Sequence, residues 1–291
     1  MLFRSELDIP LKYATKLYNE FAIRHPNAFY LRTRQRGMQN WDGKIKYITK
    51  TGQFKIGLLP SVYKRCIELG IKPIIVDMRQ SLPKVSKVVT QIGKYKLRPE
   101  QEKAVKAILS NKLGETPFQI GVLDYTVNAG KTLIMSALYL SYKKQLKTLL
   151  ITNDSDWLNQ ARDEFKQYLP GEDITFVQGK VLNWSNFTIG MVQSISRNMK
   201  YYQNELAKID MVLIDEADQG GSKQYQNVIT RLFNTRVRIG LSGTIYMSKL
   251  AKDKVKNMNL RCFFGDVIAE FKLKDSIKKG YSTKTIVKTV E

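Results

Sequence analysis

The stretch Gln119–Leu138, QIGVLDYTVNAGKTLIMSAL, decides the fold because it changes character twice along its length. Its apolar start, from Ile120 to Leu123, predicts a buried strand, and the apolar residues after Thr132 predict a helix. Between them lies a loop that ends in Gly130 and Lys131. Gly-Lys-Thr between a strand and a helix is typical of a phosphate-binding loop, although the bare tripeptide also begins ordinary helices.

The chemistry of such a loop follows from its backbone. N–H groups at the start of a helix point outward and favour negative charge. Gly130 lets the backbone approach a phosphate, Lys131 places a cation on the outer phosphates, and the Thr132 hydroxyl is suited to hold Mg²⁺. Tyr125 stands where the strict pattern has another glycine. We expect nucleotide contacts from the loop and the first helical turn: Val127, Asn128, Ala129, Gly130, Lys131, Thr132 and Leu133.

A second apolar run, Met211–Ile214, ends in the acids Asp215 and Glu216. A parallel strand would deliver these carboxylates to the carboxyl edge of a sheet, where ligands bind in open α/β folds. We expect Asp215 to hold Mg²⁺, Glu216 to deprotonate the attacking water, and Lys131 to complete the catalytic set. Acids that follow a single strand are usually loop residues, but their order after a phosphate loop favours function.

Strands and helices alternate from about residue 97 onward, which predicts an α/β fold with a doubly wound parallel sheet. Right-handed crossovers then place the Lys131 loop, the two acids and a third motif, Ser242-Gly243-Thr244, along one edge. The hydroxyls of Ser242 and Thr244 are suited to couple a nucleotide site to a nucleic acid, or they form a simple turn. Upstream, Gln101 is a candidate reader of adenine, because glutamine pairs with the adenine edge through two hydrogen bonds. The alternative is an exposed glutamine at a helix start.

Composition indicates the partners. The formal net charge is +22 and the pI about 9.8, which favours a polyanion such as nucleic acid, or else serves solubility alone. The two cysteines, Cys66 and Cys262, have no metal-like spacing and fit a reducing compartment. The N-terminus lacks a signal core, and no apolar run is long enough to span a bilayer, so we expect no membrane partner.

Residues 1–90 hold 17 Lys and Arg against 6 Asp and Glu, so 17 − 6 = +11, half of the net charge. Alternation over Phe29–Arg36 predicts a strand with Arg32, Arg34 and Arg36 on one face, and Lys44–Ile48 predicts a second strand that carries Lys44 and Lys46. We expect this basic hairpin to grip a phosphate backbone while Trp41 and Tyr47 stack on bases. The alternative is a solvated basic face with Trp41 packed beneath it. Around the hairpin, the sequence predicts a helix over 10–24, a strand over 54–59, a helix over 61–69, a strand over 72–77 and a linker over 81–93.

These motifs, in their order, resemble the first RecA-like domain of superfamily 2 helicases. Arg98-Pro99-x-Gln101 is similar to the adenine-reading motif, and the phosphate loop, Asp215–Asp218 and Ser242–Thr244 are similar to motifs I, II and III. Thr152–Gln160 and Gly190–Ser194 are similar to motifs Ia and Ib, although Asn153 stands where a proline is usual. The N-terminal stretches Asn40–Ile45 and Gly57–Leu59 are similar to the phage UvsW-type recombination and repair helicases.

The resemblance implies a small basic α+β DNA-binding domain over 1–90 and a RecA-like motor domain over 91–291. It implies ATP and Mg²⁺ as cofactors, Arg98 and Gln101 at the nucleotide, and Asn153, Gly190 and Gln193 on the nucleic-acid track. The implied substrate is DNA, branched or partly single-stranded. The family's second RecA-like domain would carry an arginine that raises the rate of hydrolysis by about 10³–10⁵. We expect that domain to be missing from these 291 residues.

We therefore expect part of an ATP-dependent DNA helicase or branch-remodelling motor, located in the cytoplasm of a host if the gene is a phage's. Its partners would be a second RecA-like domain or other replication and recombination proteins. The alternative is a nucleic-acid-binding module that binds ATP and hydrolyses little of it. A phage packaging ATPase would share the phosphate loop and paired acids, but not the Arg98–Gln101 and Asn40–Gly43 stretches.

Overall fold

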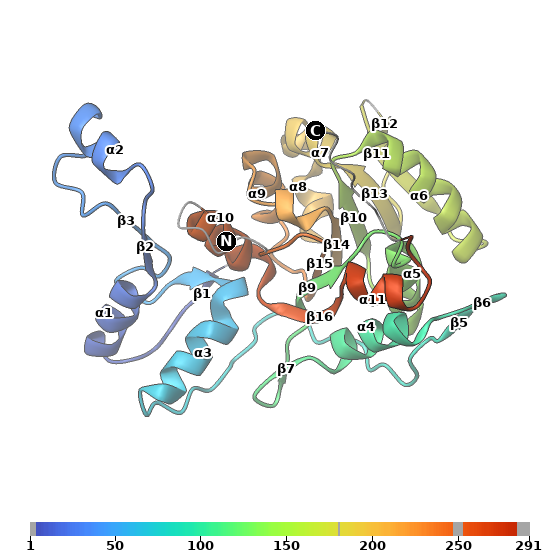
Figure 1. Cartoon of the computed structure of the whole chain (residues 1–291), viewed down its shortest axis with the longest axis horizontal. Coiled ribbons are helices and arrows are strands. Elements are labelled where there is room, and N and C mark those ends of the chain that lie inside the picture. The colour runs from blue at the N-terminus through green and yellow to red at the C-terminus, as the bar shows by residue number, and fades with distance from the viewer. Residues whose placement is uncertain (1–3, 180, 247–252, 284–291) are drawn as a thin grey trace, which may run out of the picture.

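The computed structural model describes residues 4–179, 181–246 and 253–283, and one large sheet lies at its centre (Figure 1). The sheet has eight strands in the order β12-β11-β13-β10-β14-β15-β9-β16. Every neighbouring pair is parallel except β11 with β12, so the α/β fold with a parallel sheet is confirmed. Its strands are β9 (Ile120–Tyr125), β10 (Thr148–Thr152), β11 (Ile174–Gln178), β12 (Val181–Leu182), β13 (Phe187–Met191), β14 (Met211–Asp215), β15 (Val237–Ser242) and β16 (Val267–Phe271).

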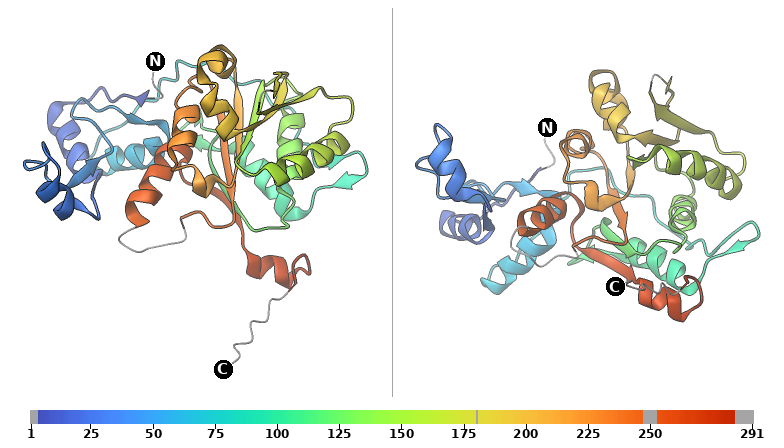
Figure 2. Two further views of the ribbon diagram at one scale, coloured as in Figure 1. Left: turned by 90° about the horizontal axis from the view of Figure 1, so that it is seen from above. Right: turned by 45° about the horizontal axis from the view of Figure 1, so that its top comes forward.

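Helices cover both faces of the sheet, as Figure 2 shows. Side chains alternate between two apolar cores because successive residues of a strand point to opposite faces: Val122 lies in one core and Leu123 in the other. The first core includes residues of α4 (Pro99–Ser110), α5 (Lys131–Ser141) and α6 (Ser155–Tyr168). The second includes residues of α7 (Val192–Arg197), α8 (Met199–Ala207), α9 (Lys223–Ile229) and α10 (Asp253–Phe264).

Short elements complete the part of the chain around the sheet. They are the hairpin of β5 (Gln91–Ile92) and β6 (Tyr95–Lys96), the hairpin of β7 (Lys112–Leu113) and β8 (Thr116–Pro117), the 3₁₀ turn η2 (Ala217–Gln219) and the helix α11 (Leu273–Lys278). Among the described residues, no helix combines the length and the apolar character needed to cross a bilayer.

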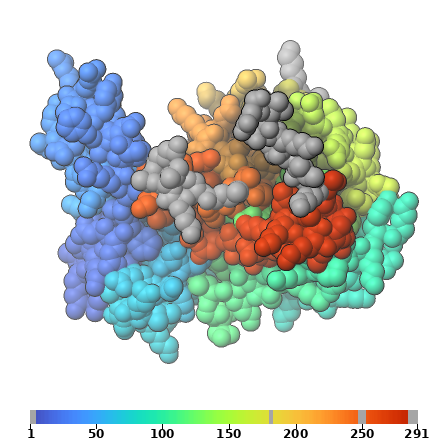
Figure 3. All heavy atoms as spheres, in the orientation of Figure 1, coloured from blue at the N-terminus to red at the C-terminus, as the bar shows by residue number. Residues whose placement is uncertain are grey.

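The N-terminal part is a small α+β assembly. It consists of β1 (Arg4–Ser5), α1 (Leu11–Glu20), β2 (Ala22–Arg24), α2 (Ala28–Arg34), β3 (Lys44–Lys46), β4 (Phe54–Lys55), η1 (Ile56–Leu58) and α3 (Leu59–Glu68). Antiparallel pairing joins β2 to β3 and β1 to β4. We call residues 22–46 the arm, because β2, α2 and β3 project from the body of the molecule (Figures 1 and 3).

The core of this N-terminal part is continuous with the second core of the sheet. Leu17, Phe54 and Leu58 belong to the same apolar cluster as Phe264 of α10. The contact is closest at Gly57, where a Cβ would lie 2.8 Å from the Cys262 carbonyl oxygen and closer still to that of Arg261. A glycine is therefore required where η1 crosses α10. The division into domains at residue 90 stays a prediction.

The strand predicted over Phe29–Arg36 is wrong, because residues 28–34 form the helix α2. Ala28 is buried and Leu31 half-buried, so the apolar contacts of this segment recur at helical rather than alternating spacing. Arg32 and Arg34 consequently do not share a face, since side chains two apart on a helix point in different directions. The basic hairpin is instead formed by β2 and β3, with α2 inserted between them.

Four other N-terminal predictions need correction. The first helix ends at Glu20, and residues 22–24 form β2 instead of its last turn. The strand predicted over 54–59 stops at Lys55, and the helix predicted from residue 61 begins at Leu59. Residues 72–77 are not a strand: Ile74 and Val76 are exposed, and Asp77 pairs with Arg79 and Arg236.

Candidate functional site

The phosphate loop links β9, in which every residue is buried, to α5, which begins at Lys131. Gly130 caps the helix with φ 72°, the left-handed region that favours glycine. A Cβ at this position would lie 3.3 Å from Nη2 of Arg98 and closer to the Gln101 amide. Asn128 also has a positive φ, 64°. The loop predicted from the Gly-Lys-Thr pattern is therefore present, between a buried strand and a helix N-terminus.

Arg98 and Gln101 support this loop from the start of α4. The Gln101 amide accepts a hydrogen bond from the Arg98 backbone N–H (2.9 Å) and donates one to the Ala129 carbonyl (2.9 Å). Arg98 Nη2 donates to the Asn128 carbonyl over 3.1 Å. Gln101 is 2% exposed, so reading adenine would require it to exchange these bonds. Its nucleotide role stays a prediction.

The departure at Tyr125 has a structural reason. The Tyr125 side chain is fully buried in the first core, and its hydroxyl donates to the Glu100 carbonyl oxygen over 2.8 Å. This bond ties the end of β9 to the first turn of α4. Where the strict pattern has glycine, this chain therefore uses a large side chain to join the two elements that support the loop.

Lys131 faces two carboxylates across the end of the sheet. Its ammonium lies 3.1 Å from Asp215 Oδ1 and 3.8 Å from Glu216 Oε1. Asp215 is the last residue of β14, and Glu216 follows it with φ 51°, so the turn after the strand is what aims the second carboxylate. Burial raises the pKa of Glu216, as do its acidic neighbours Asp215 and Asp218, whereas Lys131 acts in the opposite direction.

The donor set suits a magnesium ion that also binds phosphates. Asp215 is 2% exposed, and its Oδ1 has Lys131 as ion-pair partner but no hydrogen bond from another described residue. Thr132 adds a hydroxyl in the first turn of α5. Mg²⁺ is commonly held by one or two carboxylates together with substrate phosphates. The described residues hold no cluster of three or more His, Cys, Asp or Glu side chains that would bind a metal on protein ligands alone.

Hydrogen bonds connect the acids to the two neighbouring motifs. Ser242 Oγ donates to Asp218 Oδ1 over 2.8 Å and accepts from the Thr244 N–H over 3.1 Å. On the other side, the Asn153 amide donates to Gln219 Oε1 over 2.6 Å. Gln193 in turn donates to the Asn153 carbonyl oxygen over 3.3 Å.

These bonds connect the residues that follow β10, β13 and β14 with Ser242 at the end of β15. The Ser242-Gly243-Thr244 turn lies against the phosphate loop, since a Cβ at Gly243 would be 3.1 Å from the Thr126 Cα. Gly190 is buried in β13, where a Cβ would collide with Ile195. Val127 lies in the loop and is 70% exposed, and Leu133 is buried in α5.

Comparison with known proteins agrees with this geometry. Residues 94–247, more than half of the chain, match the ResIII family, described as the type III restriction enzyme res subunit. The chain belongs to the ResIII family. The matched range contains the Arg98–Gln101 stretch, the phosphate loop, the paired acids and the Ser242–Thr244 turn.

Individual relatives are distant. This ResIII chain is 23% identical over 272 residues to the ATP-dependent DNA helicase uvsW of Enterobacteria phage T4, which covers 86% of the chain and 51% of the relative. It is 26% identical over 147 residues to protein L396 of Acanthamoeba polyphaga mimivirus, described as a candidate ATP-dependent RNA helicase, which covers 50% and 27%. The chain thus spans about half or less of the length of these relatives.

The solved structures show the shared fold. A crystal structure of the UvsW helicase from bacteriophage T4 superposes with TM-score 0.71 at 22% identity, over 92% of this ResIII chain and 97% of that one. A second UvsW structure gives TM-score 0.69 at 21% identity, over 92% and 56%. The RecA-like fold expected from the sequence is confirmed, and the similarity extends beyond the sheet into the N-terminal part.

The arm presents most of the predicted DNA-binding cations to solvent. Arg32, Arg34, Arg36 and Lys44 are exposed, whereas Lys46 pairs with Asp42 over 3.1 Å. The two predicted stacking rings are not free. Trp41 Nε1 donates to the Lys44 carbonyl oxygen over 3.0 Å, and Tyr47 packs against the second core.

Sequence reasoning missed the contacts that the last described segment makes with β9 and with the start of α4, the two elements that support the phosphate loop. Lys272 pairs with the buried Asp124 of β9, and Lys279 pairs with Glu100 over 2.8 Å. The Tyr281 ring lies 4.3 Å from the Arg98 guanidinium. No local signal predicts pairs that are more than 140 residues apart in the chain. Gln219, by contrast, directly follows Asp218, so its place next to the acidic motif is a signal for it in the sequence.

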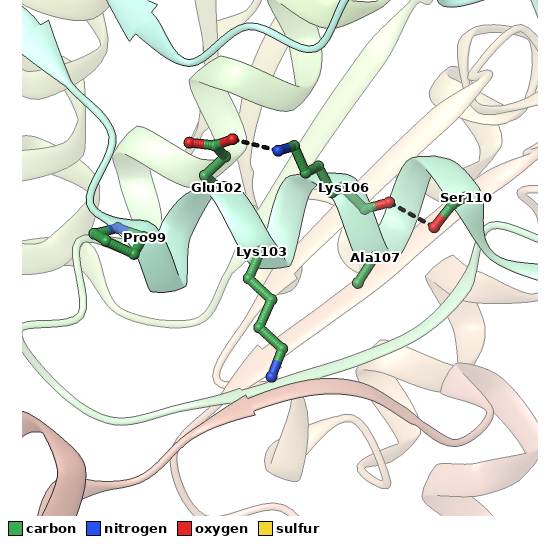
Figure 4. Close-up of a pocket in the computed structure, with 6 residues that line it drawn as sticks. All are labelled: Pro99, Glu102, Lys103, Lys106, Ala107 and Ser110. Atoms are coloured by element: carbon green, nitrogen blue, oxygen red, sulfur yellow. Dashed lines mark hydrogen bonds and ion pairs between the residues drawn. The ribbon is translucent and has the colours of Figure 1, made fainter.

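A shallow hollow of about 460 Å³ runs along α4 and is separate from this site. Figure 4 shows that its lining residues all belong to the one helix: Pro99, Glu102, Lys103, Lys106, Ala107 and Ser110. Glu102 and Lys106 pair with each other, and Ser110 Oγ donates to the Lys106 carbonyl over 2.8 Å. None of the lining residues is a predicted phosphate or magnesium ligand, so the hollow is not assigned to the phosphate site.

Proposed function

We propose that this chain is the ATP-binding and DNA-gripping part of an ATP-dependent helicase that remodels branched or partly single-stranded DNA in recombination, repair or replication. The observation that carries the proposal is the position of Lys131, 3.1 Å from Asp215 and 3.8 Å from Glu216 at the mouth of the phosphate loop. The phage relative described as an ATP-dependent DNA helicase supports the substrate class.

The proposed chemistry uses groups that already lie together. On ATP binding, the loop N–H groups and Lys131 hold the phosphates, and Lys131 exchanges its carboxylate partners for phosphate oxygens. Thr132 and Asp215 hold Mg²⁺, which supplies charge neutralisation on the phosphates when bound. Glu216 then orients the attacking water and accepts its proton, a role that its raised pKa suits.

The coupling of ATP hydrolysis to DNA binding would run through the hydrogen bonds on either side of the paired acids Asp215 and Glu216. We assign Ser242, Gly243 and Thr244 to this coupling because Ser242 holds Asp218 directly. Asn153, Gly190 and Gln193 would lie on the DNA track, with Asn153 joined to the turn after the acids through Gln219.

The domain division proposed from the sequence follows the same roles. Residues 1–90 would form a small DNA-binding domain whose arm cations contact phosphates, and residues 91–291 the motor domain. The proposed partners are a second RecA-like domain and other recombination or replication proteins. A reducing compartment such as the cytoplasm fits Cys66 and Cys262, which are free and buried; burial raises the pKa of both thiols.

ATP hydrolysis by the whole chain, with and without branched DNA, tests the proposal. We expect DNA-stimulated turnover that Glu216→Gln reduces by about 10²–10⁴, the contribution of a general base. Glu115→Gln, at an exposed turn between β7 and β8, is the matched control and should leave turnover unchanged. Turnover by Glu216→Gln at the parent rate would contradict the assigned base.

The second candidate function gives a different result in the same experiment. A nucleic-acid-binding module with little hydrolysis would show no ATP turnover in the parent chain or in Glu216→Gln. It would still bind DNA in a salt-dependent manner. Nucleotide binding, measured separately with a fluorescent ATP analogue, then distinguishes an ATP-binding half from a chain that binds DNA alone.

A further inference from the structure

Two aromatic side chains at the start of α2 are exposed to solvent at the far end of the arm. Phe29 is 80% exposed and Tyr30 56% exposed. Figures 1 and 3 show α2 at the tip of the N-terminal part, away from the sheet and its helices. Large apolar side chains that are mostly exposed next to each other point to a surface that meets a partner.

The surroundings of the rings carry charge of one sign. From Phe21 to Trp41 the sequence contains four arginines and no Asp or Glu. Arg32, Arg34 and Arg36 are exposed in or directly after α2, and the Arg34 guanidinium lies 5.3 Å from the Tyr30 ring centroid. Such a surface selects a polyanion over a neutral apolar partner.

The aromatic residues first expected to stack on bases are already engaged. Trp41 is half-buried, with its N–H bonded to the Lys44 carbonyl and its ring 5.9 Å from that of His25. Tyr47 is half-buried against the second core. Phe29 and Tyr30, in contrast, are largely exposed, and the Arg34 guanidinium beside the Tyr30 ring leaves more than half of that side chain open to a base.

We propose that Phe29 and Tyr30 form a base-stacking site that receives unpaired bases at a DNA branch point, while the neighbouring arginines hold the flanking phosphates. In an intact duplex the bases stack on each other, so a free base face exists only at ends, gaps, junctions and single strands. The site therefore prefers branched or single-stranded DNA over plain duplex. The choice of DNA as the polyanion rests on the proposed function.

The test compares binding of the whole chain, without ATP, to a plain duplex, to the same duplex with a three-way branch, and to a single strand. Phe29→Ala with Tyr30→Ala should weaken binding to branched and single-stranded DNA by about 5-fold to 100-fold, the range for loss of stacking on a base. Duplex binding should change little. Both side chains are exposed, so the fold has no packing to lose.

Matched variants separate stacking from mere apolar contact. Phe29→Tyr with Tyr30→Phe keeps both rings and should bind branched DNA as the parent does. Leu11→Ala removes another exposed apolar side chain, 74% exposed in α1, and should have no effect. A 2-aminopurine base at the branch should be quenched by the parent and not by the double alanine variant.

Equal losses on duplex and branched DNA, or unchanged quenching in the double alanine variant, would overturn the stacking site. An unchanged affinity for all three DNAs would do the same and leave the rings to a protein partner. The result is independent of hydrolysis, because no ATP is present. Failure of the ATPase proposal, seen as full turnover by Glu216→Gln, therefore leaves this measurement interpretable.

Discussion

The carboxyl edge of the sheet and the arm position their functional groups in opposite ways. At the edge, Lys131, Asp215 and Ser242 are anchored to buried strands or a buried helix, and each is paired with another site residue. In the arm, two strands of three residues each carry a helix whose charged side chains face solvent. A reaction at a phosphate needs catalytic groups at fixed distances. Binding to the phosphate backbone of DNA needs only a surface that carries positive charge.

The largest effect should come from removing the cation at the fixed edge. Lys131→Ala deletes the charge that faces Asp215 and Glu216, and we expect ATP turnover to fall by about 10²–10³, typical of losing one preorganised stabilising group. DNA affinity should stay at the parent value, since the arm is untouched. Lys103→Ala, an exposed lysine of α4, is the control. Equal loss of DNA binding and turnover would break the division between the two regions.

The junction between the regions should be next most sensitive. Gly57→Ala places a Cβ 2.8 Å from the Cys262 carbonyl and closer to that of Arg261. Overpacking of this kind typically costs about 1–3 kcal/mol, which urea unfolding measures. Gly221→Ala, whose Cβ would meet only Leu260 at 3.9 Å, should cost clearly less. Equal stability of the two variants would mean that the close contact between η1 and α10 does not require a glycine.

The arm should respond in its salt dependence. Arg32→Ala, Arg34→Ala and Lys44→Ala together should weaken binding similarly for all duplex sequences and lower the slope of log affinity against log salt by about 2 to 3. Lys84→Ala, Lys87→Ala and Lys94→Ala remove the same charge from exposed positions outside the arm. If both triple variants lower the slope of log affinity against log salt equally, the total charge of the chain governs DNA binding, and the position of the arm cations does not.

A smaller effect should separate hydrolysis from its stimulation by DNA. Ser242→Ala removes the 2.8 Å hydrogen bond to Asp218. We expect basal hydrolysis to persist and the stimulation by DNA to fall about 10-fold, in line with the loss of one hydrogen bond to a charged group. Ser242→Thr retains a hydroxyl and should recover most of the stimulation. Loss of basal turnover instead would place Ser242 in the hydrolytic step itself.

The smallest effect should be a displacement of the pH profile. Burial raises the pKa of Glu216, and a general base works only in its ionised form. Turnover at saturating DNA should therefore fall, as the pH is lowered, at a pH above the ordinary glutamate pKa. In Glu216→Gln the residual ATP turnover should not show this fall at low pH. If the fall persists in the variant, it is caused by the titration of another group.

The fold of the edge was predictable because short apolar runs that alternate with helical patterns are typical of buried parallel strands. The runs Ile120–Leu123 and Met211–Ile214 both form strands of the sheet, and parallel topology alone brings their carboxyl ends together. The arm was not predictable in the same way. Alternating exposed arginines carry no information about which face is buried, and Ala28 with Leu31 was enough to favour a helix.

The pairings of the last described segment were beyond any local rule. Lys272 and Lys279 occur among many lysines in a basic chain, and only the placement of β16 beside β9 brings them to Asp124 and Glu100. Gln101, in contrast, is predicted at the nucleotide because a glutamine side chain can pair with the adenine edge. Its contact with the Ala129 carbonyl depends on how α4 approaches the loop, which is a matter of tertiary packing.

The glycine at position 57 has a mechanical consequence. Backbone lies directly on backbone where η1 crosses α10, and α10 in turn packs against β9 and β15, the strands that end at the phosphate loop and at Ser242. At this crossing no side chain of residue 57 separates the backbone of η1 from that of α10. On the proposed function, this crossing would hold a DNA branch bound by the N-terminal part at a set distance from the proposed ATP site.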